Sequence, residues 1–577
     1  MDLNINLHTS TQSLLLETPR ILSYPSLGID IETTGLDPHT QRCVCIQIAN
    51  GIDNTVDVID LRADNFQDFF NSLNVYPGRV YIQTAEFDLR FIYKYYGNCL
   101  YLNLFDTMLA EIIILASKQL SGWSLNAIAQ KYLDIELDKS VRSEFILPMF
   151  AMMGLSETQI KYAAMDAWVL PRIGELQEKE LKETNQWKIA ELEFQVVPAV
   201  AKAELRGFLL DTEKWTGIYE KELKTSREKA DELRTLSGIK TLNPNSEKQV
   251  IAAMNRLGIE VPEFKGKLTT GETFICRIKH PFITALRTYR SAAKRASTYG
   301  KDFLQNVNPV TGRIHTQFNQ IGAETGRFSS ESPNLQNIPR ARAFRECFVA
   351  SPGMKIISAD FSSQEIAVMA QASGDPELIK IFREGLDRHT SVAADIYKVP
   401  YDEVTDEQRK AAKIVNFGVA YGSSAWNIAN NLNIPQDHAE KLLQDYWRVF
   451  TVLQKWQRRS GLLAWVKGYS QTFWGRRRYY EGLEKRRVMR MGANMEIQGT
   501  SADMSKLATV LVDTYLWDNF NFIPIINFVH DEIEIEVPEA DAVEISTRVK
   551  ELMETAGAEF VQIVKQEAHV DTGDYWL

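Results

Sequence analysis

The first third of the chain alternates short β-rich runs with helical ones, and this alternation constrains the fold more than any other feature. The runs SLGIDI, CVCIQIA and RVYIQTA are apolar and rich in β-branched residues, as is typical of strands. The run SETQIKYAAMDAWVLPRIGEL has the apolar spacing of a helix. The alternation predicts an α/β domain built around a central sheet.

Two later stretches of the 577-residue chain are mainly helical. Residues 175–236 and 376–500 have the pattern of helices, whereas PIINFVHDEIEIEVP predicts two β-runs that meet around His530. In the second run apolar residues alternate with Glu534 and Glu536, which predicts a strand buried on one face. A chain of this length exceeds a single core, so we expect several domains in an α/β multidomain protein.

Composition excludes several classes of protein. Hydrophobic residues make up 45% and charged residues 24% of the chain, which is ordinary for a folded globular protein. No apolar run reaches the about 18 residues that a membrane span needs, and the N-terminus lacks the features of a secretory signal. The five cysteines form no C-x-x-C pair, so we expect neither a disulfide framework nor a zinc site. We therefore expect a cytoplasmic, non-secreted protein.

The net charge of −10 conceals an uneven distribution. Residues 1–170 contain 20 acidic and 11 basic residues, whereas residues 441–490 contain 13 basic and 3 acidic residues. A polyanion responds to the local field, within about 8 Å in physiological salt. A basic run by itself is more often a solvated helix face. Aromatic residues interleaved with this run favour a nucleic-acid partner, and they are Trp456, Trp465, Trp474, Tyr479 and Tyr480.

Four acidic residues in the first third form a candidate metal site. Asp30 and Glu32 lie two apart at the end of an apolar run, so both carboxylates are expected on the same side of a strand. Asp88 follows in QTAEFDLRF, and Asp166 follows Tyr162 by four residues on one helical face. Converging carboxylates repel one another unless cations neutralise them, and hard oxygen ligands suit Mg²⁺ or Mn²⁺. Each piece alone is more often solvated surface.

Taken in order, these acids and the tyrosine resemble the DEDD-type 3′–5′ exonucleases, in the subgroup with tyrosine in the third motif. The resemblance covers about residues 20–185 and implies a ribonuclease H-like exonuclease domain over residues 1–185, with the four acids holding two metal ions. The chain departs from the family at Thr84, where most members have asparagine four residues before the aspartate of the second motif. This departure affects the expected rate and substrate fit but leaves the metal ligands intact.

A second set of acids lies at the ends of two further β-runs. The apolar run KIISADF ends near Asp360, and the later pair of β-runs carries Asp531 and Glu532 where they meet. If these strands lie side by side, Asp360 and Asp531 face each other and can share two Mg²⁺ ions. Such a pair suits phosphoryl transfer, in which the protein supplies position more than covalent chemistry. The tripeptide HDE by itself is more often a surface hairpin.

The helical segment EQRKAAKIVNFGVAYG carries two cations and two aromatic residues at intervals of four. Arg409, Lys413, Phe417 and Tyr421 therefore fall along one helical face. At about 1.5 Å per residue this stripe is about 18 Å long, with cations at one end and rings at the other. This is the shape of a nucleoside triphosphate, whose phosphates would meet the cations. The alternative is an amphipathic helix that packs its rings into a core.

Two polar segments offer side chains that suit a nucleic-acid duplex. The loop TGRFSSESPNLQNIPR contains four candidates for phosphates or base edges, which are Arg327, Asn334, Gln336 and Asn337. The segment RMGANMEIQGTSAD presents on one helical face Arg490, Asn494 and Gln498. Amide donors suit the minor groove, where every base pair presents acceptors. Such a stripe alone is more often a solvated face.

These segments together resemble the family A DNA polymerases of the bacterial DNA polymerase I large-fragment type. TGRFSS…PNLQNIP, DFSSQEI, RKAAKIVNFGVAYG and VHDE match that family's motifs in identity, order and approximate spacing. The resemblance implies a right-hand polymerase domain over residues 190–577, with primer–template DNA and dNTPs as partners. The implied subdomains are the thumb at about 195–305, the palm at about 306–375 and 499–577, and the fingers at about 376–498.

The resemblance also implies roles for single residues. Asp360 and Asp531 bind metal, Glu532 supports the site, and Glu365 is the steric gate that crowds a ribose 2′-hydroxyl. The family's arginine after NIP is placed at Arg345. The incoming nucleotide is assigned to His389, Arg409, Lys413, Phe417 and Tyr421. The duplex is assigned to Arg327, Asn494 and Gln498, with Arg490 near the primer–template.

We therefore expect a monomeric DNA polymerase that adds dNTPs to a primer 3′ end, with two Mg²⁺ or Mn²⁺ ions per active site. The resemblance also implies 3′–5′ proofreading and no separate 5′-nuclease domain. A single-subunit RNA polymerase-like enzyme shares the palm acids, but Glu365 and the exonuclease motifs argue against it. A catalytically lapsed primer–template binding module is the third possibility, and the complete carboxylate sets argue against it.

Overall fold

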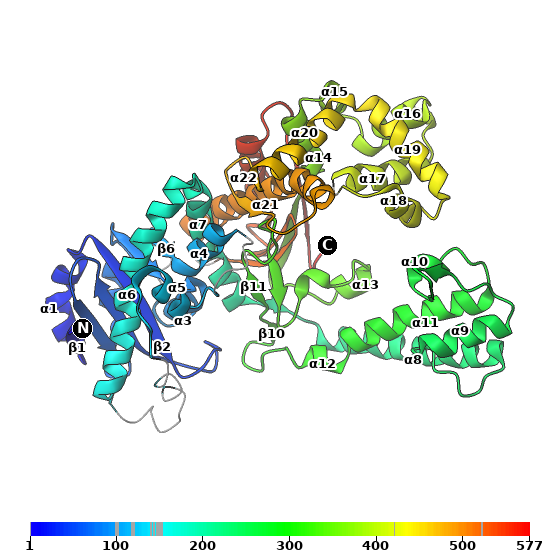
Figure 1. Cartoon of the computed structure of the whole chain (residues 1–577). Coiled ribbons are helices and arrows are strands. Elements are labelled where there is room, and N and C mark those ends of the chain that lie inside the picture. Colours follow the sequence, from blue (N-terminus) through cyan, green and yellow to red (C-terminus); the bar gives the residue numbers. More distant parts are fainter. Residues whose placement is uncertain are drawn as a thin grey trace.

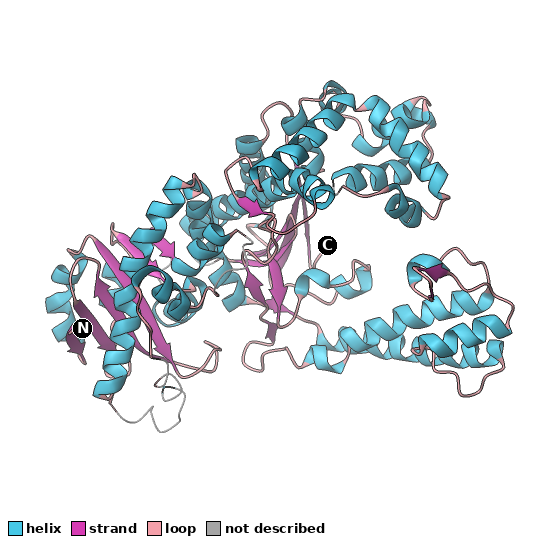
Figure 2. Cartoon of the chain, viewed as in Figure 1, coloured by secondary structure: helices cyan, strands magenta, loops and turns pink. Residues whose placement is uncertain are grey.

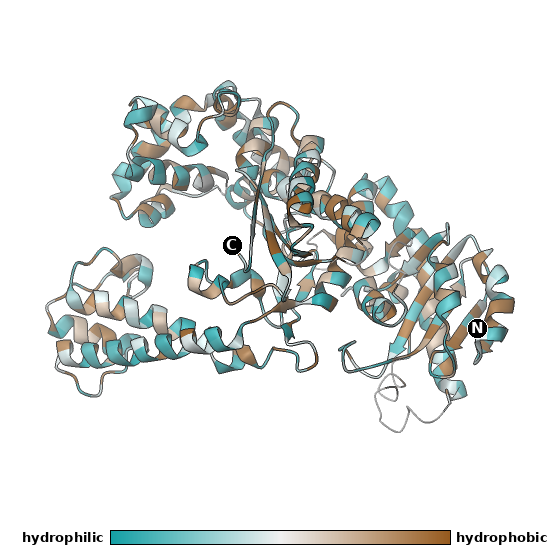
Figure 3. Cartoon of the chain, turned by 180° about the vertical axis from the view of Figure 1, so that it is seen from behind, coloured by the Kyte–Doolittle hydropathy of each residue, from teal (hydrophilic) through white to brown (hydrophobic). Residues whose placement is uncertain are grey.

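The computed structural model describes residues 2–97, 103–116, 122–138, 141, 145, 154–420, 422–520 and 523–577. Figure 1 shows three parts: an N-terminal domain, a central sheet with its helices, and two arms that extend from the centre to the same side. The central sheet combines strands from before and after the second arm in the sequence. Apolar residues are concentrated in the N-terminal sheet and in the helices that flank the central sheet (Figure 3). Among the described helices, none is both long enough and apolar enough to cross a lipid bilayer.

The N-terminal domain is built on a six-stranded sheet in the order β1-β4-β3-β2-β5-β6. Its strands are β1 (Asn4–His8), β2 (Ser26–Thr33), β3 (Cys43–Asn50), β4 (Thr55–Asp60), β5 (Arg79–Ile82) and β6 (Asn103–Asp106). Strands β2, β3 and β4 pair antiparallel, whereas β5 and β6 continue the sheet in parallel and β1 pairs in parallel with β4. The prediction of an α/β domain with a central sheet is therefore confirmed (Figure 2).

Helices cover this sheet, and one of them determines where the acids meet. They are α1 (Thr11–Leu22), α2 (Gln67–Leu73), α3 (Ala85–Tyr96), α4 (Thr107–Leu115), α5 (Leu125–Leu133) and α6 (Glu157–Glu183). Helix α6 begins with a capping box in which Ser156 and Gln159 satisfy each other's backbone N–H groups. It lies so close to β2 that a Cβ on Gly28 would be 2.4 Å from the carbonyl oxygen of Ala167. This close approach brings Asp166 beside the acids of β2.

Helix α7 (Trp187–Arg206) joins the N-terminal domain to the rest of the chain. It packs against α3 on one side and against the palm elements α21 (Lys485–Phe520) and β16 (Ile525–Val529) on the other. The expected thumb at about 195–305 therefore begins within a helix that packs on the palm. The long thumb helices begin only after the short strand β7 (Phe208–Leu209).

The predicted palm contains a four-stranded antiparallel sheet in the order β16-β17-β13-β18, and we keep the names palm, thumb and fingers for the predicted ranges. The remaining strands are β13 (Met354–Phe361), β17 (Glu532–Pro538) and β18 (Ala568–Gly573), and α21 and α22 (Ala542–Phe560) lie beside them. Shorter elements connect thumb and palm: β10 (Arg313–Ile314), β11 (Gln317–Asn319), β12 (Ser329–Glu331), the 3₁₀ turn η3 (Leu335–Asn337) and α13 (Arg342–Arg345). The two predicted β-runs around His530 are thus confirmed as β16 and β17.

The prediction that the second run is buried on one face only is wrong. Glu534 and Glu536 are 0% and 2% exposed, because β17 is an inner strand and elements pack on both of its faces. Glu536 is neutralised by ion pairs with Arg206 and Arg313, each 2.7 Å long. The Glu534 carboxylate accepts a hydrogen bond from Ser358 Oγ at 2.6 Å. The sequence alternation was sound, but buried charges with partners look the same in sequence as exposed ones.

The two arms are helical. The thumb consists of the antiparallel pair α8 (Thr212–Ser237) and α11 (Pro281–Thr298), with α9 (Glu247–Arg256), the hairpin β8 (Glu263–Phe264) and β9 (Lys267–Leu268), α10 (Glu272–Ile275) and α12 (Lys301–Leu304). Helix α14 (Gln364–Ser373) lies in the predicted palm range, just before the fingers. The predicted fingers contain α15 (Pro376–Arg383), α16 (Arg388–Tyr397), the 3₁₀ turn η4 (Tyr401–Glu403), α17 (Asp406–Ala420), α18 (Ala425–Leu432), α19 (Gln436–Val449) and α20 (Thr451–Lys467). A hairpin, β14 (Tyr469–Gln471) and β15 (Arg477–Tyr479), follows within the range that was expected to be mostly helical.

The basic run at 441–490 is less available to a partner than its composition suggests. Trp456 and Tyr480 are each only 5% exposed, and the Trp474 ring stacks on Phe560. Arg476 is buried and pairs with Asp503 at 2.7 Å and with Glu193. Much of the aromatic and cationic pattern is therefore core, and the interpretation of these rings as a nucleic-acid surface is wrong for the buried ones.

Two candidate active sites

The acids of the N-terminal domain meet where β2 faces α6. Ligand atoms of Asp30, Glu32 and Asp166 all lie within 4.8 Å of one another. The two residues of β2 share a face because side chains alternate along a strand, and α6 presents the third. The Tyr162 hydroxyl hydrogen-bonds the Asp166 carboxylate one turn away, as the spacing of four predicts. Burial and the negative charge of Asp166 raise the pKa of Tyr162, so it remains a neutral donor.

The fourth acid, Asp88, lines the same cavity from α3 without joining this group of three. It is 3% exposed, and burial together with the charges of Asp106 and Glu86 raises its pKa well above the usual value. Its Oδ1 atom is buried and makes no hydrogen bond to any described residue. A buried carboxylate oxygen without a donor, beside three clustered carboxylates, is the environment that a hard divalent cation would relieve. The residues present therefore fit such an ion.

Thr84, the departure from the resemblance, occupies a special backbone position. It precedes α3 with φ at 58°, in the left-handed region. The backbone is held there because Asp106 accepts hydrogen bonds from the N–H groups of Thr84 and Ala85, at 3.3 and 2.7 Å. Asparagine tolerates this region, whereas a β-branched residue is strained in it. Threonine in place of asparagine at position 84 therefore adds backbone strain beside the site.

Sequence reasoning missed most of the residues that line this cavity of about 620 Å³, among them Leu36, Trp123 and Gln317. Leu36 and Trp123 are 69% and 53% exposed, which is unusual for large apolar side chains. The Trp123 backbone is anchored because its carbonyl oxygen accepts a 3.0 Å hydrogen bond from Gln83 Nε2. Gln317 reaches the cavity from β11, outside the N-terminal domain. No spacing rule reveals them, since they are single residues brought together by the fold.

The second site lies at one end of the two inner strands of the palm sheet. Strand β13 pairs with β17 so that Asp360 lies opposite Glu532, and Asp531 occupies the turn just before β17. His530 has φ at 60°, which makes the turn tight enough to leave Asp531 beside Asp360. Burial raises the pKa of both aspartates, and the charges of Asp531 and Glu532 contribute to the value of about 6 at Asp360. The expectation that the two strands lie side by side is confirmed.

Glu532 is held in place by two residues from elsewhere in the chain. Arg345 donates to Glu532 Oε1 and Oε2 at 3.1 and 3.3 Å, and Trp576 Nε1 donates to Oε1 at 2.9 Å. The Arg345 guanidinium also lies 4.4 Å from the Trp576 ring centre. Arg345 is the position at which the resemblance placed the family's arginine, and the structure puts it against the acids. This pairing fixes the Glu532 carboxylate beside the two aspartates.

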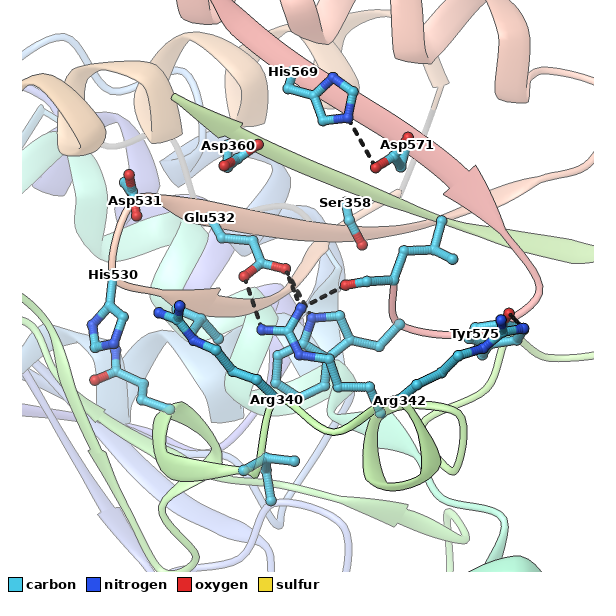
Figure 4. Close-up of a pocket in the computed structure, with 16 residues that line it drawn as sticks. Arg340, Arg342, Ser358, Asp360, His530, Asp531, Glu532, His569, Asp571 and Tyr575 are labelled. Carbon is cyan, nitrogen blue, oxygen red and sulfur yellow. Dashed lines mark hydrogen bonds and ion pairs between the residues drawn. The ribbon is translucent and has the colours of Figure 1, made fainter. Parts of the chain in front are cut away.

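The acids open into a cavity of about 630 Å³ with cations on the facing wall (Figure 4). Arg340 and Arg342 extend from the loop below the sheet, while Asp360 and Asp531 lie above them in this view. His569 and Asp571 from β18 line the same side as Asp360 and are joined by a 3.0 Å contact. Crowded carboxylates with raised pKa values opposite arginines fit both hard cations and anionic phosphates.

The predicted nucleotide helix is present, with Lys413 exposed and Arg409 half-buried. Arg409 and Lys413 lie on α17, where Arg409 forms a two-armed ion pair with Asp387 at 3.0 and 2.8 Å. The backbone of Phe417 is part of α17, whereas Tyr421 lies outside the described residues. The structure therefore brings the cationic half of the stripe to the surface.

His389 lies on α16, the helix next to α17, rather than on the stripe itself. Its ring is 7% exposed and contacts Asn416 of α17 through Nδ1 at 3.2 Å. Burial lowers the pKa of His389 to about 4, so the ring is neutral at physiological pH. It can therefore donate or accept one hydrogen bond but brings no positive charge to a phosphate.

Glu365 lies at the start of α14, close to the predicted loop. It is 6% exposed, and its Oε1 atom accepts a 2.5 Å hydrogen bond from Arg327 Nη2. The turn before Arg327 contacts the Arg476 side chain through Gly326, whose φ is 83°. The two predicted residues thus form one unit, in which an arginine fixes the orientation of the carboxylate.

Two of the polar loop residues serve the protein rather than facing outward. Asn334 Oδ1 accepts from the backbone N–H of Asn337 at 3.1 Å and so caps η3, and Gln336 Nε2 donates to the Phe528 carbonyl at 3.0 Å. The α21 stripe runs from an exposed Arg490, through a half-buried Asn494, to Gln498, which is 8% exposed. The helix therefore presents this face obliquely, with only its first member fully in solvent.

Comparisons with known proteins agree with this geometry. Residues 213–577 match the family model described as DNA polymerase family A, and residues 9–182 match a 3′–5′ exonuclease model. The chain is 31% identical to DNA polymerase I of Borreliella burgdorferi over 97% of its own length and 63% of that protein. It is 36% identical to the thermostable DNA polymerase I of Thermus filiformis over 69% of its length and 49% of that protein.

A solved structure covers nearly the whole chain. It is the polymerase domain of Pol1 from M. smegmatis in complex with DNA primer–template and dNTP, with a TM-score of 0.85 and 26% sequence identity. The likeness covers 99% of both chains. The curated relatives are longer, since the chain spans only about half their length, 49% and 63% in the two cases above.

Proposed function

The chain belongs to DNA polymerase family A, and from this premise we propose that it extends a DNA primer along a template with dNTPs. The observation that carries the proposal is the meeting of Asp360 and Asp531 in one cavity that faces a cationic wall. Because the relatives include bacterial DNA polymerase I proteins, the proposal includes a cytoplasmic location with the template DNA. We expect the chain to act as a monomer.

Divalent metal dependence is general in this family, and we propose that Asp360 and Asp531 hold Mg²⁺ or Mn²⁺ here. Two such ions supply the charge neutralisation that phosphoryl transfer needs. The chain's own contribution is to hold the two aspartates close together, with Glu532 fixed beside them by Arg345. Because Asp360 has a pKa of about 6, we expect it to release its proton fully only above that pH.

Selection of the incoming nucleotide is assigned to the fingers and to α14. Arg409 and Lys413 would bind the triphosphate, after Arg409 exchanges its Asp387 partner for phosphate oxygens. Buried Glu365, oriented by Arg327, would crowd a ribose 2′-hydroxyl and so favour dNTPs. His389 would contribute a neutral hydrogen bond. Phe417 and Tyr421 retain the roles implied by the resemblance, beside the sugar and the templating base.

The duplex would lie along α21 and the loop before η3. Arg327, Asn494 and Gln498 are proposed to follow its minor groove, with Arg490 near the primer–template. Asn334 and Gln336 would act indirectly, because their amides hold the loop that presents Asn337. Donors in the minor groove test the shape of a base pair without reading its sequence.

We propose that the N-terminal domain removes nucleotides from a mismatched primer 3′ end. Asp30, Glu32 and Asp166 form a cluster tight enough for one ion to bridge, and Asp88 adds an unsatisfied carboxylate oxygen in the same cavity. Tyr162 is a neutral donor beside them, suited to orienting a water against a phosphodiester. The domain would then proofread what the palm synthesises.

The direct test is extension of a labelled primer–template with four dNTPs and Mg²⁺, run with matched and mismatched 3′ ends. We expect stepwise extension of the matched primer and shortening of the mismatched one before extension resumes. Absence of any Mg²⁺-dependent turnover would support the catalytically lapsed binding module instead.

The RNA polymerase alternative is separated by the sugar of the substrate. We expect the wild-type chain to incorporate dNTPs at least about a hundredfold better than rNTPs, since a gate that excludes a hydroxyl acts by steric clash. The Glu365→Ala variant should lose most of this preference while still extending with dNTPs. Equal use of both sugars by the wild type would contradict the assignment of Glu365.

A further inference from the structure

The tip of the thumb touches the fingers through a small aromatic cluster. It joins Phe264 in the β8–β9 hairpin, Phe274 in α10 and Trp426 in α18. The two phenylalanine rings lie 5.2 Å apart, and each lies 6.2 Å from the Trp426 ring, measured between ring centres. These separations are within the range of favourable aromatic pairs. Residues more than 150 positions apart in sequence thus meet at the ends of two separate arms.

A polar contact accompanies the rings. Arg277, just after α10 in the thumb, donates through Nη2 to the Ala429 carbonyl at 2.9 Å and to Asn430 Oδ1 at 3.2 Å. Both acceptors belong to α18 of the fingers. A guanidinium that contacts a carbonyl and an amide at once sets the orientation of the tip relative to α18. The contact therefore has a defined geometry in addition to its apolar part.

The position of the contact gives it a topological consequence. Both arms leave the palm, and Figure 1 shows α10 and α18 at their far ends, facing each other across the side on which the arms extend. At about 1.5 Å per residue the 26-residue helix α8 is about 39 Å long, so the meeting point is far from the palm. Palm, thumb, contact and fingers are then joined to one another in a closed series.

We propose that this contact is a latch that closes the DNA cleft into a ring, so that the chain retains its primer–template through many additions. The inference rests on the proposed polymerase function and goes beyond it, because it assigns a DNA-retaining role to Phe264, Trp426 and Arg277. The cluster touches neither of the acid cavities. Its effect is therefore on dissociation of DNA and not on the chemical step.

The construction of the contact suits a latch better than a permanent interface. Phe264 and Trp426 remain 43% and 40% exposed, whereas a core ring of the thumb base such as Trp215 is 1% exposed. Such a small surface is far below what holds two independent proteins together. The arms are tethered to one palm, however, so the contact re-forms easily after each opening. DNA can thus enter through an open latch and be retained by a closed one.

The first test measures how far one enzyme molecule extends a primer before it leaves. Extension is started together with a heparin trap, so that each product reports a single binding event. We expect Trp426→Ala and Phe264→Ala to shorten the products and speed DNA dissociation by about three- to tenfold, as loss of one or two aromatic pairs implies. The rate of adding one nucleotide to DNA already bound should stay within about twofold of wild type.

Controls separate this role from others. Leu268→Ala removes a side chain of the same hairpin that is similarly exposed, at 48%, but takes no part in the cluster, and it should behave as wild type. Arg277→Ala should act in the same direction as the ring variants. Unchanged product length and dissociation in all three latch variants would overturn the proposal. So would faster association of DNA with unchanged dissociation, since that would indicate a barrier to entry. A wild type that extends no primer would instead refute the polymerase function itself.

The second test asks whether the ring is closed around DNA. Cysteines introduced by Phe264→Cys and Trp426→Cys, in a background with Cys276→Ser, are joined by a short bismaleimide after the protein binds primed DNA. On a circular template the joined protein should survive a high-salt wash, whereas on a short linear template it should slide off. Equal loss from both templates would show that DNA does not pass through the ring.

Discussion

The two acid sites have cavities of nearly equal volume, about 620 Å³ in the N-terminal domain and about 630 Å³ in the palm, yet their linings differ. The palm cavity faces its acids with Arg340, Arg342 and Arg345. The arginine that lines the N-terminal cavity, Arg90, is buried and paired with Glu204 at 3.0 Å, and the cavity has Leu36 and Trp123 at exposed positions. Cations suit the phosphates of a duplex and a triphosphate, whereas rings suit the exposed bases of a single strand. The lining, more than the acids, distinguishes what each site can accept.

The acids themselves are arranged differently for a structural reason. In the N-terminal domain one strand supplies Asp30 and Glu32, and helix α6 supplies Asp166. Because Gly28 lets α6 approach this strand closely, the ligand atoms of the three acids lie within 4.8 Å of one another. In the palm the acids come from a strand and a neighbouring turn, and Asp360 and Asp531 form no comparable group of three ligands among the described residues. A tight group holds ions by itself, whereas a looser pair leaves room for substrate oxygens as further ligands.

The largest predicted effect is that a substitution in either acid site removes one activity and leaves the other intact. Asp531→Ala should lower primer extension by more than about a thousandfold, because several kcal/mol of metal-borne stabilisation are lost, while degradation of a single strand continues. Asp30→Ala should do the reverse. The measurement is extension and 3′ degradation of labelled DNA by both variants, with binding to duplex as a check that each is folded.

The two variants also test whether the sites are separate. If Asp531→Ala removed both activities in a folded protein, the comparison above would be wrong, and one site would serve both reactions. Retained extension by Asp531→Ala would refute the palm assignment. Unchanged degradation by Asp30→Ala would refute the four-acid interpretation of the N-terminal domain.

The second prediction concerns the linings. Trp123→Ala should weaken binding of single-stranded 3′ ends by about tenfold or more, since stacking of a base on a ring is worth about 1–3 kcal/mol, with no change in salt dependence. Arg340→Ala should instead weaken duplex binding and reduce the salt slope by about one, as loss of one phosphate contact requires. Affinities measured over a series of salt concentrations distinguish the two. A changed salt slope in Trp123→Ala would contradict the proposed stacking.

The sequence predicted the acids of both sites better than it predicted their surroundings. Asp30, Glu32 and Asp166 could be placed because strand and helix periods determine which side chains share a face. Asp360 and Asp531 needed only the assumption that two strands pair, and they do. For each site, the side-chain period of its elements and one contact between distant elements were enough to predict which acids meet.

The linings and partners could not be predicted in this way. Trp123 and Gln317 reach one cavity from distant segments, and nothing local to either residue indicates it. Glu534 and Glu536 were predicted to lie on a solvent face, but Arg206 and Arg313 from other elements form ion pairs with Glu536. Buried ion pairs of this kind depend on tertiary contacts, which sequence periodicity does not encode.

The third prediction concerns the stability cost of ionising Asp360 in the palm site. The pKa of Asp360 is raised from 3.8 to about 6 by burial and by the charges of Asp531 and Glu532. Across that window the folded chain binds the proton more tightly than the unfolded chain, so stability is lost as the pH rises through it. At about pH 8 without Mg²⁺, Asp360→Asn should be more stable by about 1–2 kcal/mol after allowance for solvent screening, while extension is lost.

Thermal unfolding of the wild type and Asp360→Asn in a chelator, at low and high pH, measures this effect. The difference should vanish at about pH 3, where the wild-type carboxyl is protonated in both states. Added Mg²⁺ should also reduce it, because a bound cation offsets the repulsion in the wild type. A variant less stable than the wild type at high pH would show that the aspartates are not crowded.

The smallest predicted effect concerns Thr84, beside the N-terminal site. Its φ of 58° is imposed by the hydrogen bonds from two backbone N–H groups to Asp106, so the strain lies in the side chain that must occupy that backbone. Thr84→Asn should stabilise the N-terminal domain by about 0.5–1 kcal/mol, because asparagine tolerates the left-handed region and a branched residue does not. Thr84→Val keeps the branch and should give no gain, which makes it the matched control in denaturant unfolding. Because Asp106 fixes the backbone in every variant, single-strand degradation should stay within about twofold of wild type. A gain shared by both variants would place the cause in the lost hydroxyl and not in backbone strain.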